Sequence, residues 1–539
     1  MNRRDLAFDR SRKNLLSVSP KPCLVVIKLK RPAGISRNLI SYWLAFLVSA
    51  GTGFFLSPYV VNHLGNTGYG IWTLLTALVG YLGLLDFGVR GTVTRYIAHH
   101  HAVGDSISSS AIVSAGLIMF TMLGTLAIAI AASFAYFSPL MFTIPEGLVL
   151  ETRLVLIVGG TTMAATLIGA VFGGVVTGLE RFDVSSGIEI SVTLLRTLAV
   201  VISLGAGYGL VTLAFIHFFA SVINGLATWV AARRLYPDLR INFKTPLLPH
   251  MRTILSFSFY LSALHVFSAL IFYSDALVIA AFLPVSSVTY FAIAGNLGDY
   301  ARQVASAFSM LMTPRVSALT AIGSAEVANE IASAARLATL VTAPIALTFW
   351  VRGESFINLW MGPEFGTVSG QVLRILSFVV LFAGARQVAT SSIIGVNKHR
   401  ELIPALAFEA VSNVLLSIAL VRPFDVAGVA LGTMIPNLLV GLLFIPHHLQ
   451  KSTGIPMLQF YHRAWFLPFF ACIPFLVCSY LIERYIPATN LAIFFVQVGM
   501  ILPTVGLGAY AVCLSETERK AITAGIFNVF RSVFRRGEK

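Results

Sequence analysis

SPYVVNHLGNTGYGIWTLLTALVGYLGLLDFGVRGTVTRYIAHHHAVGD (57–105) is the stretch that decides the fold of this chain. It opens at the end of one apolar run, turns at Leu64 and Gly65, and continues into a second apolar run near 69–89. An α-helix needs about 20 mainly apolar residues to cross a bilayer, and each run has that length. The stretch therefore predicts a hairpin of two membrane-spanning helices.

The composition of the whole chain fits such a protein. Of its 539 residues, 57% are hydrophobic and 11% are charged, and the mean hydropathy is +0.83. Soluble chains carry about a quarter charged residues, so most of this chain is expected to lie in lipid. The net charge of +15 is spread over short segments between apolar runs, and we therefore predict no nucleic-acid partner.

Measured by the same length, the chain has fourteen predicted spans and an all-α, polytopic fold. Pro284 is taken as the break between the seventh and the eighth span. The spans are expected near 39–61, 69–89, 108–137, 153–177, 188–206, 210–232, 254–283, 286–312, 331–351, 370–394, 402–421, 426–447, 464–483 and 491–513.

The basic residues predict the orientation. With the N-terminus in the cytoplasm, 29 of the 38 Lys and Arg residues fall in cytoplasmic segments. Three, Arg352, Arg422 and Arg484, fall on the opposite side, and six lie within spans. Cytoplasmic loops are enriched in Lys and Arg. We therefore expect a multi-pass protein of the bacterial inner membrane with both termini in the cytoplasm.

The predicted loops leave no room for several classes of function. The longest non-cytoplasmic connection, 352–369, is too short for a catalytic domain. The chain contains no G-x-x-x-x-G-K-[ST], H-E-x-x-H or G-x-S-x-G motif. We therefore predict a protein that is not an enzyme and that uses no cofactor and no resident metal ion.

An internal repeat relates the two halves of the chain. A shift of 219 residues places LGNTGYGIW (64–72) on LPVSSVTYF (283–291), and it also aligns Tyr81 with Tyr300. Six predicted spans separate the copies. Because six is an even number, the two copies have the same orientation, which predicts two parallel six-helix lobes, as transporters often have.

The stretch 57–105 resembles the first hairpin of the Wzx-type oligosaccharide flippases. The resemblance is carried by Leu64-Gly65, Tyr69-Gly70, Leu85-Asp86-Phe87-Gly88 and Thr94-Arg95-Tyr96. These flippases belong to the polysaccharide transporter branch of the MOP superfamily, together with MATE drug exporters and MurJ-type lipid II flippases. The resemblance implies two six-helix lobes around a cavity that opens alternately to each side of the membrane.

The chain departs from the lipid II flippases in one respect. Lipid II flippases resemble one another in carrying arginines in the first helix, whereas this chain has none between Arg37 and Arg90.

The fold that the resemblance implies divides the chain into consecutive parts. The expected parts are a basic cytoplasmic segment (1–37), the N-lobe (38–232), a cytoplasmic linker (233–252), the C-lobe (253–447), spans 13 and 14 (464–513), and a basic cytoplasmic tail (514–539) with an amphipathic helix.

Charged residues inside spans are the candidate site residues, because a charge in lipid is costly and is usually functional. Arg302 and Arg386 are candidates for binding a diphosphate, to which guanidinium groups donate paired hydrogen bonds. The structural alternatives are that Asp299 neutralises Arg302, three residues away on the same helix, and that Glu409 pairs with Arg386.

The acids suggest coupling and gating. Asp275, with Asp299, is a candidate for carrying a coupling proton or sodium ion, and its alternative role is to pair with Arg302. Asp86 and Arg90, four residues apart at the inner end of span two, either form a local salt bridge or form a gate at which Arg90 meets the phosphates of the cargo.

We therefore expect a flippase for an undecaprenyl-diphosphate-linked oligosaccharide that feeds the synthesis of a surface polysaccharide or an exopolysaccharide. Its partners would be the lipid-linked glycan, membrane lipids and polysaccharide polymerase or assembly proteins. The alternatives are a MATE-like drug/ion antiporter, which predicts an acidic cavity, and a non-transporting scaffold of a polysaccharide assembly complex.

Overall fold

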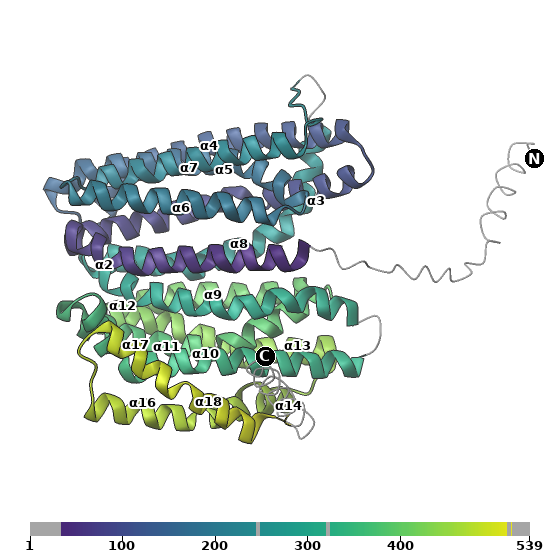
Figure 1. The fold of residues 1–539 in the computed structure, drawn as a ribbon. Coiled ribbons are helices and arrows are strands. Elements are labelled where there is room, and N and C mark those ends of the chain that lie inside the picture. Colours follow the sequence, from purple (N-terminus) through teal and green to yellow (C-terminus); the bar gives the residue numbers. More distant parts are fainter. Residues whose placement is uncertain (1–33, 244–247, 320–323, 515–518, 520–539) are drawn as a thin grey trace, which may run out of the picture.

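The computed structural model describes residues 34–243, 248–319, 324–514 and 519, and over these residues it consists of helices and connecting turns without a strand (Figure 1). The first half contains α2 (Gly34–Leu82), η1 (Gly83–Asp86), α3 (Val89–Ala102), α4 (Ser106–Met141), η2 (Glu146–Leu148), α5 (Val149–Gly178), α6 (Phe182–Gly205) and α7 (Leu210–Leu235). The second half contains α8 (Leu248–Phe282), α9 (Ser287–Leu319), α10 (Ser324–Trp360), α11 (Pro363–Gly395), η3 (His399–Leu402), α12 (Ile403–Leu439), η4 (Val440–Phe444) and α13 (Ile445–Thr453). The chain continues through α14 (Met457–Tyr461), η5 (His462–Phe466), α15 (Leu467–Ala471), α16 (Ile473–Tyr485), α17 (Leu491–Ile501), α18 (Pro503–Gly508) and η6 (Ala509–Cys513).

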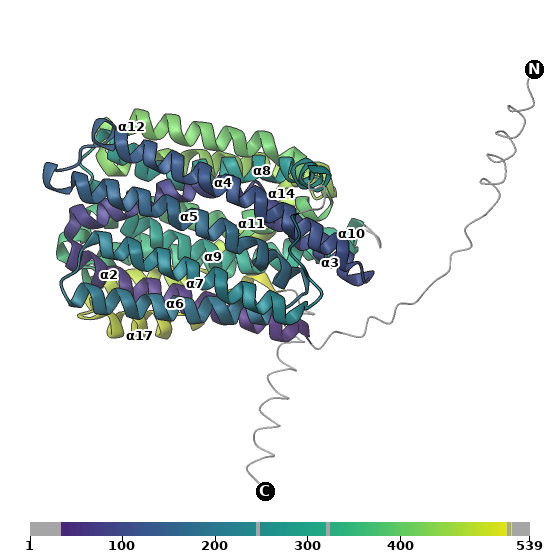
Figure 2. The same cartoon turned by 90° about the horizontal axis from the view of Figure 1, so that it is seen from above.

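The helices form two lobes with long, roughly parallel axes. In Figure 1, α2 to α7 make up the upper lobe and α9 to α13 the lower one, and Figure 2 shows the same layers from above. Helix α8 joins the lobes, because it packs on α12 and also contacts α2, α3 and α4. The predicted two-lobe, all-α membrane fold is confirmed, whereas the residue boundaries of the lobes and linker stay predictions.

Two of the helical stretches turn back on themselves. Among the described residues, eleven stretches are long and apolar enough to cross a membrane, and two of them, Trp43–Asp86 and Arg400–Thr453, have 44 and 54 residues. The first breaks at Gly65, with a φ of 69°, and the second at Asp425, with a φ of 52°. Helix α9, the predicted eighth span, is not among the eleven. Fourteen spans are consistent with these elements, and the exact number stays a prediction.

The turn at Asp425 closes a tight helical hairpin. Across it, Ser417 Oγ donates to the carbonyl of Val429 at 3.5 Å. A Cβ on Gly432 would lie 2.4 Å from Ser417 Oγ, and one on Gly428 would lie 2.0 Å from the carbonyl oxygen of Leu420. The farther a contacting pair lies from the turn, the greater is its separation in sequence, as expected for two antiparallel helices. Small residues let two helix backbones approach this closely inside a membrane.

The two turns related by the repeat touch each other reciprocally. A Cβ on Gly70 would lie 2.2 Å from the carbonyl oxygen of Val285, and Thr289 Oγ1 donates to the carbonyl of Asn66 at 2.6 Å. Under the 219-residue shift, Val285 is the counterpart of Asn66, and Thr289 is the counterpart of Gly70. Reciprocal contacts of this kind are the signature of a two-fold axis, so the lobes are related by a pseudo-two-fold axis that passes between these turns.

Aromatic side chains join the lobes beside the same turns. The ring of Phe54 in α2 stacks on that of Trp360 in α10, with centroids 4.8 Å apart and an interplanar angle of 8°. The indole Nε1 of Trp360 donates to the carbonyl of Phe54 at 3.0 Å. By the predicted orientation, this is the non-cytoplasmic end of the molecule, and it is closed in this structure.

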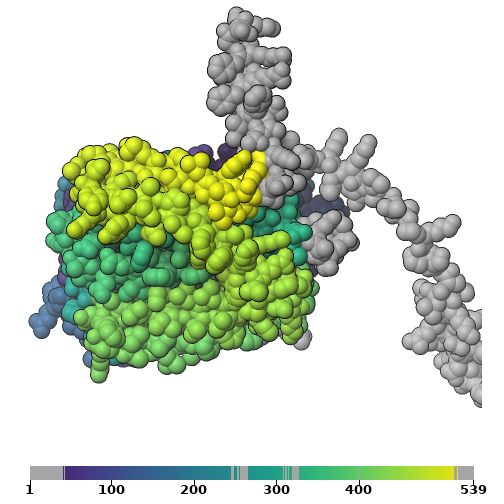
Figure 3. Space-filling view, turned by 90° about the horizontal axis from the view of Figure 1, so that it is seen from below, coloured from purple at the N-terminus to yellow at the C-terminus, as the bar shows by residue number. Residues whose placement is uncertain are grey.

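The last helices are attached to α10 by a buried arginine. Arg352 is fully buried, and its Nε donates to Glu483 of α16 at 2.8 Å. Its Nη2 donates to Gln497 of α17 at 2.5 Å, and the guanidinium lies 4.4 Å from the ring centroid of Phe494. Figure 3 shows the yellow C-terminal helices as a band along the green C-lobe.

Arg352 also corrects a prediction. The connection expected at 352–369 is wrong, because α10 continues to Trp360 and α11 begins at Pro363. Arg352, the charged residue at which the predicted span ended, is accommodated inside the protein by partners more than a hundred residues away. Of the basic segment predicted at 1–37, residues 34–37 begin α2 and residues 1–33 lie outside the described residues. Of the tail predicted at 514–539, the structure describes residues 514 and 519, so the amphipathic helix predicted there also lies outside the described residues.

Candidate functional site

Each lobe contains a cavity that is lined by polar residues of its long helices. The C-lobe cavity measures about 450 Å³ and lies between α8, α9, α11 and α12. The N-lobe cavity measures about 330 Å³ and lies between α5, α6 and α7, with Arg90 of α3 at its edge. The candidates Arg302, Arg386 and Asp299 line the first cavity. Arg90 lines the second, and neither Asp86 nor Asp275 lines either of them.

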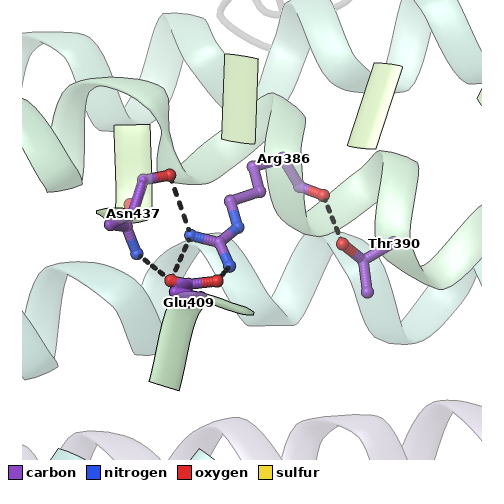
Figure 4. Close-up of polar contacts among 4 residues, drawn as sticks. All are labelled: Arg386, Thr390, Glu409 and Asn437. Carbon is purple, nitrogen blue, oxygen red and sulfur yellow. Dashed lines mark hydrogen bonds and ion pairs between the residues drawn. The ribbon is translucent and has the colours of Figure 1, made fainter. Parts of the chain in front are cut away.

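Arg386 is held by a carboxylate inside the C-lobe (Figure 4). Its Nη1 and Nη2 donate to the two oxygens of Glu409 at 3.0 and 2.5 Å. The side chain of Glu409 is 1% exposed and also accepts a hydrogen bond from Asn437 Nδ2 at 2.9 Å. The pairing weighed from the sequence is therefore present. Because Arg386 remains 15% exposed at the cavity wall, it can still donate toward the cavity.

Arg302 forms an ion pair with Asp299, one turn earlier on α9. The carboxylate of Asp299 is 49% exposed, so solvent weakens this pair. The guanidinium also lies 4.5 Å from the ring centroid of Phe272 in α8, which adds a cation–π contact. Arg302 thus faces the cavity between one aromatic face and one accessible acid.

Asp275 is buried in α8 behind this cavity, against the α12 hairpin. Its Oδ2 accepts a hydrogen bond from Thr433 Oγ1 at 2.9 Å, whereas its Oδ1 is buried and has no hydrogen-bond partner. Asn413 Nδ2 donates to the same Thr433 hydroxyl at 3.1 Å, and Ser274 Oγ donates to Asn413 Oδ1 at 3.0 Å. The ion pair between Asp275 and Arg302 that the sequence allowed is not formed.

The oxygens around Asp275 fit a small cation or a proton. A buried carboxylate without a direct ion pair is costly, and the hydrogen bond that Oδ2 of Asp275 accepts comes from the neutral hydroxyl of Thr433. A proton on Oδ1, or a monovalent cation held by carboxylate, hydroxyl and amide oxygens, would remove this cost. The arrangement is therefore consistent with the ion-coupling role predicted for Asp275.

Asp86 and Arg90 lie at the junction between η1 and α3. The carboxylate of Asp86 accepts a hydrogen bond from the backbone N–H of Arg90 at 3.2 Å, and the two side chains form no ion pair within 4 Å. The Arg90 guanidinium instead extends along α5, about 3.8 Å from the point that a Cβ on Gly173 would occupy. Asp86 therefore shapes the start of α3, and Arg90 is left available to the N-lobe cavity.

The N-lobe cavity contains charged residues that the sequence did not single out as binding residues. Arg196 and Glu189 of α6 and His217 of α7 line it. Asn224 Nδ2 donates to Glu189 at 3.5 Å, and the ring of His217 lies 4.8 Å from that of Trp72. From the sequence alone, Glu189 and Arg196 share one face of the fifth predicted span, seven residues apart, and this spacing favours structural pairing with neighbouring residues.

The two cavities repeat one polar contact. In each lobe, a glutamate on the fifth predicted span accepts a hydrogen bond from an asparagine on the sixth. These pairs are Glu189 with Asn224 and Glu409 with Asn437. The two glutamates are 220 residues apart, within one residue of the repeat shift, whereas the two asparagines are 213 residues apart, six residues from it. The two cavities therefore share one kind of polar contact and differ in their arginines.

A periodicity in the sequence could have revealed the N-lobe cavity. Residues spaced by three and four lie on one helix face, and three consecutive spans each carry a stripe of polar or small residues at this spacing. The stripes are Thr162, Thr166, Gly169 and Gly173 in α5, Ser185, Glu189, Thr193 and Arg196 in α6, and His217, Ser221, Asn224 and Thr228 in α7.

Comparisons with known proteins agree with this architecture. A protein of Bacillus subtilis described as the uncharacterized membrane protein EpsK is 24% identical over 428 residues, which cover 76% of this chain and 82% of that protein. A protein of Haloferax volcanii described as a "Probable low-salt glycan biosynthesis flippase" is 22% identical over 438 residues, 80% of this chain and 86% of that one.

Among solved structures, an inward closed lipid II flippase MurJ has the same fold. Its TM-score is 0.70 at 12% sequence identity, and the match covers 88% of this chain and 98% of that one. The model of the family described as "Polysaccharide biosynthesis protein" matches residues 35–320, more than half of the chain. With this match, and with two lobes that each enclose a polar cavity, the chain belongs to the polysaccharide biosynthesis protein family of membrane transporters.

Proposed function

We propose that this protein is a flippase that moves an undecaprenyl-diphosphate-linked oligosaccharide from the inner to the outer leaflet of a bacterial inner membrane, with both termini in the cytoplasm. The glycan would serve the synthesis of a surface polysaccharide or an exopolysaccharide. Polysaccharide polymerase and assembly proteins are the expected partners. The proposal is supported by the family match and by the name of the relative from Haloferax volcanii.

The observation that carries the proposal is the pair of arginines at the C-lobe cavity. Arg302 and Arg386 place two guanidinium groups on the wall of a cavity of about 450 Å³. A diphosphate needs such donors once it leaves water, because lipid offers it no hydrogen bonds. The head of the cargo would lie against these arginines while its polyprenyl tail stays in the bilayer.

Alternating access would move the cargo. In the present structure, the lobes touch at the turns around Asn66 and Thr289 and at Phe54 and Trp360. Opening this end and closing the other would expose the head to the opposite face of the membrane. We propose that Asp275 couples this motion to a proton or a sodium ion, since its free oxygen lies between α8 and the α12 hairpin.

The test is translocation of a fluorescent lipid-linked oligosaccharide in proteoliposomes that contain the full chain. We expect the wild type to translocate it, and the double variant Arg302→Ala with Arg386→Ala to lose at least tenfold in rate. Arg374→Ala is the matched control, because this arginine of α11 is exposed and lines neither cavity. An unchanged rate in the double variant would refute the assignment of these two arginines.

Folding must be tested separately, because removal of Arg386 leaves Glu409 buried without its charge partner. Arg302→Ala alone keeps the test informative, since the partner Asp299 is half exposed and can be solvated. Thermal unfolding of each variant in detergent distinguishes a lost site from a lost fold. A wild-type protein that translocates no lipid-linked glycan would refute the proposed function itself.

A further inference from the structure

The arginines of the two cavities differ in whether a carboxylate neutralises them. In the C-lobe, Arg386 pairs with Glu409, and Arg302 pairs with Asp299. In the N-lobe, neither Arg90 nor Arg196 forms an ion pair within 4 Å with any described residue. A charge inside a membrane protein normally has a partner, so the N-lobe cavity has unsatisfied binding capacity.

The cavity arises from how closely α5 and α7 approach each other. A Cβ on Gly169 would lie 2.9 Å from the Cα of Gly225, so these helices meet at backbone distance at that point. Helix α6 lies farther away and leaves the cavity of about 330 Å³. Small-molecule sites measure about 300 to 1,000 Å³. The N-lobe cavity therefore suits one sugar or phosphate group rather than a whole oligosaccharide.

The charges in the cavity favour an anion. Arg90 and Arg196 contribute two positive charges, and Glu189 contributes one negative charge, which Asn224 already binds at 3.5 Å. His217 also lines this cavity, and its imidazole ring offers one N–H donor in the neutral form. The MATE-like alternative requires an acidic cavity for a cationic drug, and this wall has the opposite sign.

Neutral donors on the same wall add hydrogen-bonding capacity. The hydroxyls of Thr166 and Ser221 lie 2.7 Å apart and bridge α5 and α7 beside the arginines. Guanidinium groups recognise carboxylates and phosphates through paired N–H donors, and nearby hydroxyls complete such sites. With a neutral sugar bound, Glu189 would be the one negative charge facing two arginines in this cavity.

We propose that the N-lobe cavity is a second binding site, centred on Arg196 with Arg90 at its edge, that takes an oxyanion of the cargo. The oxyanion is either the carboxylate of an acidic sugar or a phosphate of the lipid carrier, which share the same recognition chemistry. This inference rests on the proposed function, because a glycan-lipid cargo would bring such a group into the cavity.

Binding is tested first, with the full chain in detergent. Glucuronate, inorganic pyrophosphate and neutral glucose are titrated by calorimetry into the wild type, Arg196→Gln and the control Arg374→Gln. We expect glucuronate or pyrophosphate, but not glucose, to bind the wild type and the control. We expect Arg196→Gln to weaken that binding at least tenfold, and Arg196→Lys to restore part of it because the charge returns. Equal binding by Arg196→Gln and the wild type, or no oxyanion binding by a folded wild type, would overturn the proposal.

Translocation then identifies the source of the oxyanion. Two lipid-linked glycans that share the diphosphate carrier are compared, one neutral and one with a uronic acid. A carboxylate site predicts that Arg196→Gln slows only the acidic glycan, and a phosphate site predicts that it slows both. If both glycans move at wild-type rates in Arg196→Gln, this inference fails while the proposed function stands. If the wild type moves neither glycan, the proposed function fails.

Discussion

Replacing Glu483 by alanine is the sharpest test of how the last two spans are held to the C-lobe. The carboxylate of Glu483 is the only ion-pair partner of the fully buried Arg352 among the described residues. Without it, Arg352 keeps the amide oxygen of Gln497 at 2.5 Å and the ring of Phe494 at 4.4 Å. The positive charge would then be buried with neutral partners only.

The expected loss is large for a single substitution. Removing one partner of a buried ion pair costs about 3 to 5 kcal/mol. We expect the lower part of this range, because Glu483 is 20% exposed and Arg352 keeps two contacts. Glu483→Gln should cost about half as much, because it keeps an oxygen acceptor for Arg352 Nε and loses only the charge.

The free energy of unfolding is measured by titration with SDS in mixed micelles. The control is Arg463→Ala, which removes a hydrogen bond of 2.9 Å to Asn329 in an exposed position and should cost less than about 1 kcal/mol. Limited proteolysis adds a local readout, because a loosened α16 should be cleaved in the connection at 486–490 before the rest of the chain.

The double variant Arg352→Leu with Glu483→Leu distinguishes two causes of instability, a buried unpaired charge and a loss of packing. Apolar residues of similar volume often replace a buried ion pair without net cost, so the double variant should be more stable than Glu483→Ala. Wild-type stability in Glu483→Ala would show that the charge is not buried as described. A double variant as unstable as Glu483→Ala would show that packing, rather than charge, holds these spans.

Three further predictions follow from the fold and the site. Gly70→Leu should keep the two turns apart, because a Cβ at Gly70 already meets the carbonyl oxygen of Val285 at 2.2 Å; spin-label distances across the turns should lengthen, and an unchanged distance would contradict the contact. Asp275→Asn should abolish the dependence of translocation on a proton or sodium gradient, and a persistent gradient dependence in this variant would exclude Asp275 as the coupling group. At the start of α4, hydrogen bonds from Ser108 lower the pKa of Asp105. A lowered pKa means that the charged carboxylate stabilises the start of α4 at pH values above this pKa. Protection of the first α4 amides from hydrogen exchange should therefore fall as the pH drops through the pKa. Asp105→Asn should remove this pH dependence.

The fold could largely be predicted because membrane spans are long and apolar, so that the break at Pro284 and the turn at Leu64 and Gly65 are visible in the sequence alone. The end of α10 could not be predicted, because a charged residue such as Arg352 after a long apolar run indicates the end of a span unless its buried partner is known. That partner, Glu483, is distant in sequence and is brought close only by the packing of α16.

The site was partly visible for a similar reason. Asp299 and Arg302 are neighbours on one helix, so their ion pair follows from spacing, and Glu409 was already a candidate partner of Arg386. Whether Arg196 forms a direct ion pair depends on the direction of the Glu189 side chain, which helical spacing does not determine; in the structure, Glu189 accepts a hydrogen bond from Asn224. The hydrogen bond from Thr433 to Asp275 depends on the hairpin that folds back in α12.

The paired turns between the lobes form a joint whose halves have unequal strength. One half is the close approach of the Gly70 backbone to the carbonyl oxygen of Val285, in which no side chain takes part at Gly70. The other half is the hydrogen bond of 2.6 Å from Thr289 to Asn66, worth about 0.5 to 1.5 kcal/mol. Separation of the lobes at these turns must therefore break a side-chain hydrogen bond at Thr289, whereas at Gly70 it must undo only a backbone contact.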